Sequence, residues 1–216
     1  MNNTLNIYFS DYIVPIRYNS ILLGTGIIHK SLLITAAHVV EELKYEKWDF
    51  SFLYHEQPSA VNWDSELFFE YDKEKHNYYR DLAIFRTRIL QNGLFFESVK
   101  KFNERTASIF GYFEDAHTNI AVNSSTGEIR MRPVLEKNIP LHKNTILLMD
   151  IANINACNSG CPLLNSDKRV LGILSAGNQD LHYARFVSSD HIIEVLDIDR
   201  KCKDALLEYE NSRTNS

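Results

Sequence analysis

The sequence predicts an all-β protein that ends in an α-helix. Short apolar or alternating runs, separated by turn residues, recur from residue 12 to residue 187. Several short strands at such spacing are typical of antiparallel barrels and sandwiches. The last segment differs, because its apolar residues recur at helical spacing behind the serine-rich start Ser188-Ser-Asp190. That pattern predicts one C-terminal helix from about His191.

Six strand-like runs precede residue 89, and their spacing predicts a closed antiparallel barrel. They are residues 12–18, 21–28, 32–35, 50–54, 66–71 and 82–88. Residues 39–44 favour a helical turn. Gly24 and Gly26 allow the second run to bend sharply, or another strand to approach it closely.

A second strand-rich series follows residues 89–104, which we expect to link two halves of the chain. Its expected strands are residues 107–110, 119–122, 128–135, 146–149, 170–175 and 183–187. The tetrapeptide Ser124-Ser-Thr-Gly127 predicts a hairpin loop. In the C-terminal helix, the charged residues 197–204 are expected to break or expose its middle, and residues 211–216 to fray.

Composition excludes several classes of function. The chain has 216 residues and a formal net charge of −5, with a pI near 5.9, which argues against a nucleic-acid surface. It has no apolar run long enough to span a bilayer, and its first residues do not resemble a secretory signal. The three cysteines, Cys157, Cys161 and Cys202, are not placed to staple distant loops. A reducing, cytoplasmic setting is therefore expected.

Three residues carry the chemistry that the sequence predicts. Ser159 lies between small residues in Asn158-Ser-Gly160, His38 ends Thr35-Ala-Ala-His38, and Asp81 opens Asp81-Leu-Ala-Ile84. A neutral serine is a poor nucleophile unless a base takes its proton and a carboxylate orients that base. Taken singly, each residue also fits an ordinary turn or strand end. Together they predict nucleophilic catalysis.

These motifs resemble those of the trypsin-like, chymotrypsin-fold serine proteases. Residues 35–38 match the family's histidine motif, 81–84 its aspartate motif, and Asn158-Ser-Gly-Cys-Pro162 its serine motif. The order His, Asp, Ser is also the family's order. The resemblance covers roughly residues 10–195 and is closest to the short bacterial-type branch, which includes glutamyl endopeptidases and the high-temperature-requirement proteases.

The resemblance implies two six-stranded antiparallel β-barrels and a C-terminal helix. Residues 1–95 would form the barrel that carries His38 and Asp81, residues 96–188 the barrel that carries Ser159, and residues 189–216 the helix and tail. The active site would lie in the cleft between the barrels. The implied activity is that of a serine endopeptidase that forms an acyl-enzyme on a peptide or protein substrate.

Further site residues follow from the same resemblance. The main-chain N–H groups of Cys157 and Ser159 would form the oxyanion hole. Asn153 would lie at the base of the primary specificity pocket and His182 in its far wall, near Arg185. Ser175, Ala176 and Gly177 would form the edge strand that pairs with the substrate backbone. Because Asn153 is neutral, a preference for Arg or Lys is not supported; Asp180 could favour a basic residue, His182 or Arg185 an acidic one, and a small or polar residue is equally open.

The functional expectation is a selective intracellular protease, such as a bacterial defence-associated enzyme, which a partner protein could regulate. We expect no metal, cofactor, nucleic-acid or membrane partner. The alternative is a pseudoprotease or peptide-binding module on the same fold, and an esterase-like hydrolase is a third option. The main departure from the family is Cys157, which stands where the family normally has glycine. It is either a small tolerated residue or a redox-sensitive one, and a Cys157–Cys161 disulfide is also open.

Overall fold

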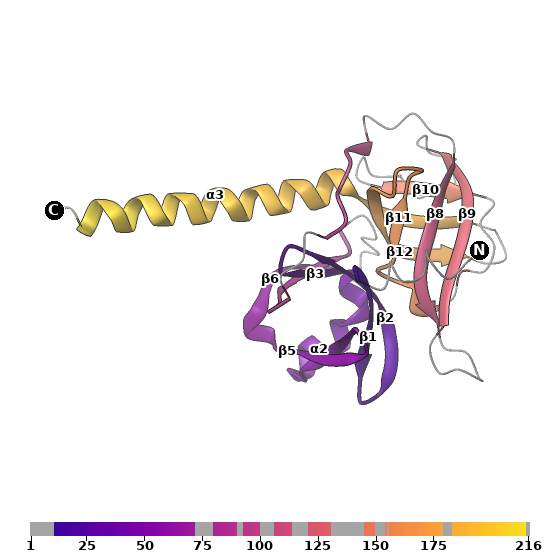
Figure 1. Ribbon diagram of the computed structural model, residues 1–216, viewed down its shortest axis with the longest axis horizontal. Helices are drawn as coiled ribbons and strands as arrows, with labels where there is room; N and C mark the ends of the chain where they lie inside the picture. Colours follow the sequence, from indigo (N-terminus) through magenta and orange to yellow (C-terminus); the bar gives the residue numbers. More distant parts are fainter. Residues whose placement is uncertain are drawn as a thin grey trace.

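The computed structural model describes residues 11–71, 80–89, 93–99, 106–113, 121–130, 145–149, 154, 156–178 and 183–214. It contains two antiparallel β-sheets and a long C-terminal helix (Figure 1). This confirms the predicted mostly-β, chymotrypsin-like architecture. The strands of the first sheet are β1 (Ile13–Tyr18), β2 (Ile21–His29), β3 (Leu32–Thr35), β4 (Phe50–Tyr54), β5 (Gln57–Val61), β6 (Glu66–Glu70) and β7 (Leu82–Arg86).

The second sheet is a closed barrel with the strand order β10-β13-β12-β11-β8-β9. Its strands are β8 (Thr106–Phe113), β9 (Ala121–Arg130), β10 (Thr145–Met149), β11 (Pro162–Leu164), β12 (Val170–Asn178) and β13 (Tyr183–Ser188). The first sheet is curled into a half-barrel, not closed as expected, and among the described residues it has seven strands in the order β5-β4-β1-β2-β3-β7-β6, one more than the six expected. Short helical segments accompany the sheets: η1 (Ala37–Val39), α2 (Glu41–Glu46), η2 (Trp63–Ser65) and η4 (Ala156–Asn158).

The additional strand, β5, belongs to a hairpin that the sequence pattern does not predict. Both central residues of its turn, His55 and Glu56, have left-handed backbone angles, with φ of 47° and 64°. Two-residue turns of this kind match the twist of the flanking strands, and they usually carry Asn-Gly or Asp-Gly. Here the pairing of β4 with β5, from Phe50 opposite Val61 to Tyr54 opposite Gln57, holds two non-glycine residues in that conformation.

The predicted hairpin loop at residues 124–127 is wrong. These residues lie inside β9, which pairs with the whole of β8, from Thr106 opposite Glu128 to Phe113 opposite Ala121. Serine, threonine and glycine favour turns when only local sequence is considered. Closure of the barrel places a continuous partner strand beside them, and the ladder hydrogen bonds decide their conformation. The outer parts of the two strands expected on either side of this loop, residues 119–120 and 131–135, lie outside the described residues.

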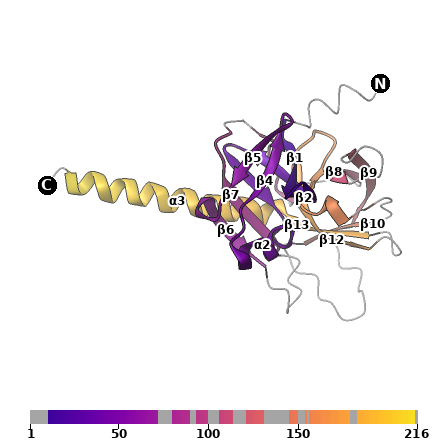
Figure 2. The ribbon, with the colours of Figure 1, turned by 90° about the horizontal axis from the view of Figure 1, so that it is seen from below.

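The C-terminal helix, α3 (Ser189–Thr214), begins slightly before the expected position and runs without interruption through the charged residues 197–204. Its first turns lie against the two sheets, and its remainder projects away from them (Figure 2). Ile192 is fully buried at the base of the helix. Ser189 hydrogen-bonds through its hydroxyl to the main-chain oxygen of Glu97, so this serine ties the helix to the segment that links the sheets.

The two sheets share an apolar core. One buried cluster joins Ile27 and Ile84 of the first sheet to Leu164 and Ile173 of the barrel and to Ile192 of α3. Tyr112 of β8 adds a polar tie, because its phenol donates to the carbonyl oxygen of Ile13 at 3.0 Å. Burial raises the pKa of Tyr112 to about 12, so this donor keeps its proton throughout the physiological range.

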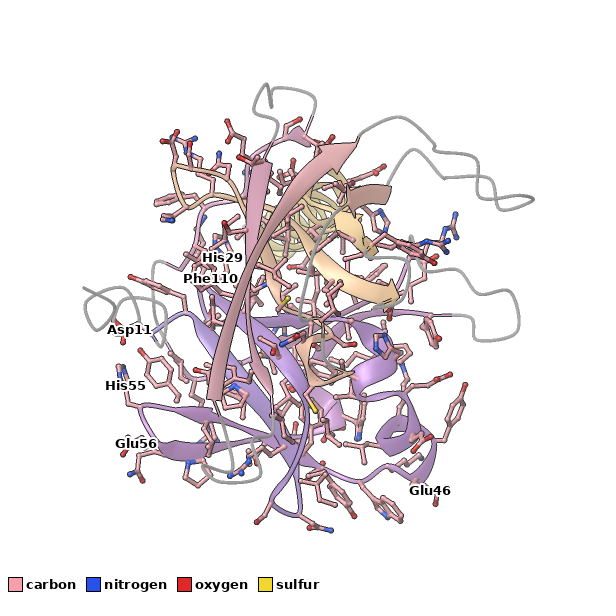
Figure 3. The ribbon with its side chains drawn as sticks, turned by 90° about the vertical axis from the view of Figure 1, so that its right-hand side faces the viewer. Asp11, His29, Glu46, His55, Glu56 and Phe110 are labelled. Atoms are coloured by element: carbon pink, nitrogen blue, oxygen red, sulfur yellow. The ribbon has the colours of Figure 1, made fainter. Side chains whose placement is uncertain are left out.

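The described part of the linking segment is hydrogen-bonded both to the barrel and to β2. Phe95 O accepts from Val170 N at 2.8 Å, and Glu97 N donates to Val170 O at 3.0 Å. His29, at the end of β2, is only 8% exposed and bonds through Nδ1 to Leu94 O at 2.9 Å. Burial lowers the pKa of His29, which favours the neutral ring. Figure 3 shows His29 and Phe110 near the junction of the sheets, whereas His55 lies beside Asp11 at the edge of the first sheet.

The double substitution His55→Asn, Glu56→Gly should stabilise the fold. A β-carbon in the left-handed region costs about 1–2 kcal/mol per residue, and Asn-Gly is the pair that this turn type prefers. We expect the free energy of unfolding to rise by about 1 kcal/mol in urea titrations. The matched control is His55→Ala, Glu56→Ala, which also removes the His55–Asp11 contact of 3.5 Å but keeps both β-carbons. Equal stability in the two variants would contradict this account of the turn.

Candidate active site

In the candidate site, His38 and Asp81 are joined by two hydrogen bonds. His38 lies in η1, immediately after β3, and the neighbouring Ala36 and Ala37 are fully buried. Asp81 precedes β7 and is also fully buried. One carboxylate oxygen accepts from the amide of His38 at 2.9 Å, and the other lies 2.6 Å from Nδ1 of the ring. The carboxylate can only accept there, so Nδ1 carries the proton and Nε2 is left as a base.

A third hydrogen bond to Asp81 comes from the opposite sheet. Ser175 Oγ donates to Asp81 Oδ2 at 2.5 Å, and Ser175 is only 4% exposed. The register of β12 against β13 shifts between Leu174 and Ala176. A bulge of this kind re-aims a side chain, and it places the Ser175 hydroxyl on the carboxylate. The side chain of Ser175 is therefore engaged by Asp81, and only its backbone remains for the expected pairing with substrate.

Serine 159 follows η4, in a turn that buried neighbours hold in place. The carboxamide of Asn158, fully buried, donates to Tyr112 O at 3.0 Å. Gly160 has φ of +84°, and a β-carbon there would lie 2.0 Å from Thr25 O. Gly160 N donates to Leu174 O at 2.7 Å. A residue with a side chain fits neither the backbone angle nor the space at position 160, so the Ser-Gly motif is a geometric requirement of this turn.

Threonine 25 of β2 connects the serine turn to the first sheet. Its amide donates to Ser159 O at 2.8 Å, and its hydroxyl donates to Cys157 O at 3.2 Å. The same hydroxyl accepts from Tyr112 N at 3.0 Å. The close approach needs the preceding glycine, because a β-carbon at Gly24 would meet Ser159 O at 2.9 Å. A glycine in this run thus permits close approach, but it is the serine turn that approaches and not another strand as expected. Nothing in the local sequence identified Thr25 itself.

The two cysteines of the serine turn differ in environment. Cys161 is fully buried, and burial raises the pKa of its thiol well above the usual range. Cys157 is partly exposed, and its Sγ lies 3.7 Å from Leu22 O. Both are free thiols, so no disulfide joins them. The thiol at position 157 is therefore the accessible one of the pair, two residues before Ser159.

The remaining predicted site residues are placed as follows. Gly177 is exposed and Ala176 half-buried on β12, and they pair with Ala184 and Arg185 of β13. Asn153 and His182 lie outside the described residues, as does Asp180. Between His38 and Ser159, both of which are described, no side-chain hydrogen bond is formed. Such catalytic contacts are often long in the absence of substrate.

Comparisons with known proteins identify the family. The sequence model described as Trypsin matches residues 4–188, most of the chain. The chain belongs to the trypsin family. It is thus a trypsin-like serine endopeptidase, and the resemblance seen in its three motifs is confirmed. Comparison with curated protein sequences gave no match.

Solved structures of trypsin-like proteases share the fold. The Rv3671c protease of M. tuberculosis in its active form is 16% identical, with a TM-score of 0.63 over 91% of this chain and 84% of that one. A Glu endopeptidase is 15% identical, with a TM-score of 0.63 over 89% and 91%. Neuropsin from mouse brain is 13% identical, with a TM-score of 0.64 over 88% and 95%. At these identities the likeness shows the fold alone.

Other kinds of site are not found in the described part of the chain. No group of three or more His, Cys, Asp or Glu residues there could hold a metal ion. Among the described helices, α3 included, none is long and apolar enough to cross a membrane.

Replacing Ser175 by alanine should weaken the site without unfolding the protein. The change removes one of three donors to a buried carboxylate, and hydrogen bonds to charged groups contribute about 1.5–3 kcal/mol. We expect kcat/KM on a short peptide ester to fall by about tenfold or more. Ser166→Ala, at an exposed serine between β11 and β12, is the control. Unchanged turnover in Ser175→Ala would show that this bond does not orient Asp81.

Alkylation of Cys157 should inactivate the protein. The partly exposed thiol lies beside the serine turn, so an added group would obstruct the substrate. Iodoacetamide treatment of a Cys202→Ser background should abolish ester hydrolysis, whereas Cys157→Gly in that background should keep its turnover after treatment. Buried Cys161 should stay unlabelled, as checked by peptide mass spectrometry. Full activity of the background after complete labelling at Cys157 would mean that the cysteine is merely tolerated.

Proposed function

We propose that this trypsin-like endopeptidase hydrolyses peptide bonds through His38, Asp81 and Ser159. The observation that carries the proposal is the two-point attachment of His38 to Asp81, by its amide at 2.9 Å and its ring at 2.6 Å. This attachment fixes both the position and the tautomer of the ring, and Nε2 is left free of the carboxylate. A base of this kind is what a serine nucleophile requires.

The proposed reaction begins with attack of Ser159 Oγ on the carbonyl carbon of the scissile bond. Nε2 of His38 takes the hydroxyl proton, and Asp81 stabilises the resulting imidazolium while remaining ionised itself. The tetrahedral intermediate collapses as His38 returns the proton to the leaving amine, and an ester of Ser159 remains. Water activated by His38 then attacks this ester, releasing the acid and restoring the serine hydroxyl.

The developing oxyanion would be bound by the main-chain N–H groups of Cys157 and Ser159. The turn that carries them is fixed by Thr25, which bonds the carbonyl oxygens of both residues. A preorganised donor of this kind typically contributes about 2.7–4 kcal/mol to transition-state stabilisation. The hydrogen bonds between the turn and strands β2 and β12 therefore limit movement of the turn and keep the two N–H groups in position.

The proposed setting is a reducing compartment, with a protein or peptide as substrate and a partner protein as the regulator. Support comes from Cys157 and Cys161, which lie in one turn and are both free thiols. The protein would then be an intracellular protease that is selective for its substrate, and a role in bacterial defence is included in this proposal. Profiling of a peptide library would identify the residue that is preferred on the acyl side of the scissile bond.

A peptide-binding module without catalysis is the second candidate. One observation favours it: a cysteine stands at position 157, where the family normally has glycine. Reaction with a fluorophosphonate probe distinguishes the candidates, because only an activated serine is labelled at an appreciable rate.

Ser159→Ala and His38→Ala should each abolish probe labelling and peptide hydrolysis while the fold is kept. The two residues act as one unit, so loss of either removes nearly the whole covalent route. Asp81→Asn should lower kcat by about 10⁴-fold, because an amide favours the wrong histidine tautomer. Circular dichroism verifies folding, and Ser166→Ala serves as the labelled control. Labelling of Ser159→Ala at the wild-type rate would refute the proposed nucleophile.

A further inference from the structure

The C-terminal helix α3 extends well beyond the body of the protein. It has 26 residues and is therefore about 39 Å long. Its first turns contact β12 and β13, and the rest projects away from both sheets (Figures 1 and 2). A helical segment of about 12–15 residues is only marginally stable in water by itself, because most helical stability in proteins comes from packing of one face. We therefore expect the projecting half to pack against a partner.

Apolar residues recur along α3 at the spacing of a helix–helix contact. They are Val195, Ile198, Cys202, Ala205 and Tyr209, and we call these five residues the helix stripe. They follow one another at alternating intervals of three and four residues, and residues at such intervals share one face of an α-helix. Near the start of the stripe, Ile198 is 56% exposed. The stripe is therefore open to contact where the helix leaves the sheets.

A hollow lies beside the start of the helix stripe. It is formed by residues of β6, β7 and α3, and all but one of them are apolar: Leu67, Phe68, Ile84, Val195, Leu196, Ile198 and Asp199. Its volume of about 260 Å³ is below the usual range for a small-molecule site. A single large side chain from a neighbouring helix suits a hollow of this size better.

The charges of α3 favour antiparallel pairing with a second copy of the same helix. The basic residues 200, 201 and 203 precede the acidic residues 204, 208 and 210. Two antiparallel copies bring the basic segment of each beside the acidic segment of the other. Parallel copies would instead bring Glu194 of one helix beside Asp199 of the other, at the flanking positions where paired helices need opposite charges.

One antiparallel alignment satisfies both the stripe and the charges. It places Ile198 level with Tyr209 of the second copy, and Cys202 level with Ala205 of the second copy. Lys201 precedes Cys202, and Glu208 precedes Tyr209, so in this alignment Lys201 of each copy lies near Glu208 of the other. Tyr209 of the second copy then lies beside the hollow.

We propose that α3 forms a two-fold symmetric, antiparallel pair with α3 of a second copy of the chain, and that Tyr209 of that copy fills the hollow beside Ile198. The occupant is a second copy because the stripe and the charges of α3 complement themselves when one helix is reversed. A two-fold axis makes every contact occur twice, so each charge pair counts twice in the stability of the dimer. The proposal concerns assembly and does not depend on the proposed catalytic role of Ser159.

The experiment measures the mass of the whole chain against concentration by analytical ultracentrifugation. The samples are wild type, Lys201→Glu, Glu208→Lys and an equimolar mixture of these two variants. Wild type should dimerise. Each variant alone places two pairs of like charges in the contact, and its dissociation constant should rise by about tenfold at low salt. In mixed dimers opposite charges face each other again, so the mixture should regain the affinity of wild type.

Lys47→Glu and Glu46→Lys are the matched controls. They make the same changes of charge at exposed residues at the end of α2, outside the helix stripe, and both should dimerise as wild type does. Ile198→Asp removes the apolar contact at the hollow and should abolish the dimer at concentrations where wild type is fully dimeric. Circular dichroism verifies that each variant keeps its helix.

The possible results identify the occupant of the stripe. A wild type that stays monomeric at its highest soluble concentration would overturn the proposal, and a different protein would then be the occupant. A dimer that tolerates Ile198→Asp would also overturn it, because another surface would join the copies. Charge variants that mixing does not rescue would exclude the antiparallel alignment and with it the proposal.

Discussion

The buried carboxylate of Asp81 is the constraint on which the candidate site depends. A buried charge without partners costs several kcal/mol, and removal of one partner from a buried pair typically costs about 3–5 kcal/mol. Asp81 meets this requirement with donors from both halves of the chain: the amide and ring of His38 beside it, and the hydroxyl of Ser175 on the barrel. Its full complement of bonds exists only when the two sheets are docked. The orientation of His38 is therefore coupled to the assembly of the whole fold.

Docking of the sheets rests on two interactions of different kinds. An apolar cluster that includes Ile27, Ile173 and Ile192 joins the first sheet, the barrel and α3, and its contribution grows with the apolar area removed from water. At the serine turn the contact is polar and directional, with Thr25 bonded to the main chain of Ser159 and Cys157. The apolar cluster supplies affinity between the halves. The hydrogen bonds of Thr25 then fix the register in which they meet, which apolar packing alone would leave less sharply defined.

The residues that the sequence identified and those that it missed differ in a physical way. His38, Asp81 and Ser159 lie in short motifs because each needs particular neighbours: small buried alanines before the histidine, a buried strand after the aspartate, and a glycine at φ +84° after the serine. Ser175 and Thr25 act through partners that are far away in the chain. Asp81 lies 94 residues from Ser175, and Ser159 lies 134 residues from Thr25. Their roles depend on a bulge and on the docking of two sheets, which no local pattern encodes. The same reason accounts for β9, where a partner strand overrides the turn preference of residues 124–127.

A site fixed from both sides leaves little room for selection by movement of the catalytic residues. The serine turn is bonded to β2 and to β12, and His38 is bonded twice to one carboxylate, so the geometry that performs the chemistry is the same for every bound peptide. Interactions with the parts of the substrate away from the scissile bond must then decide which chains are cleaved, since remote binding energy can be used to lower the barrier at the reacting carbon.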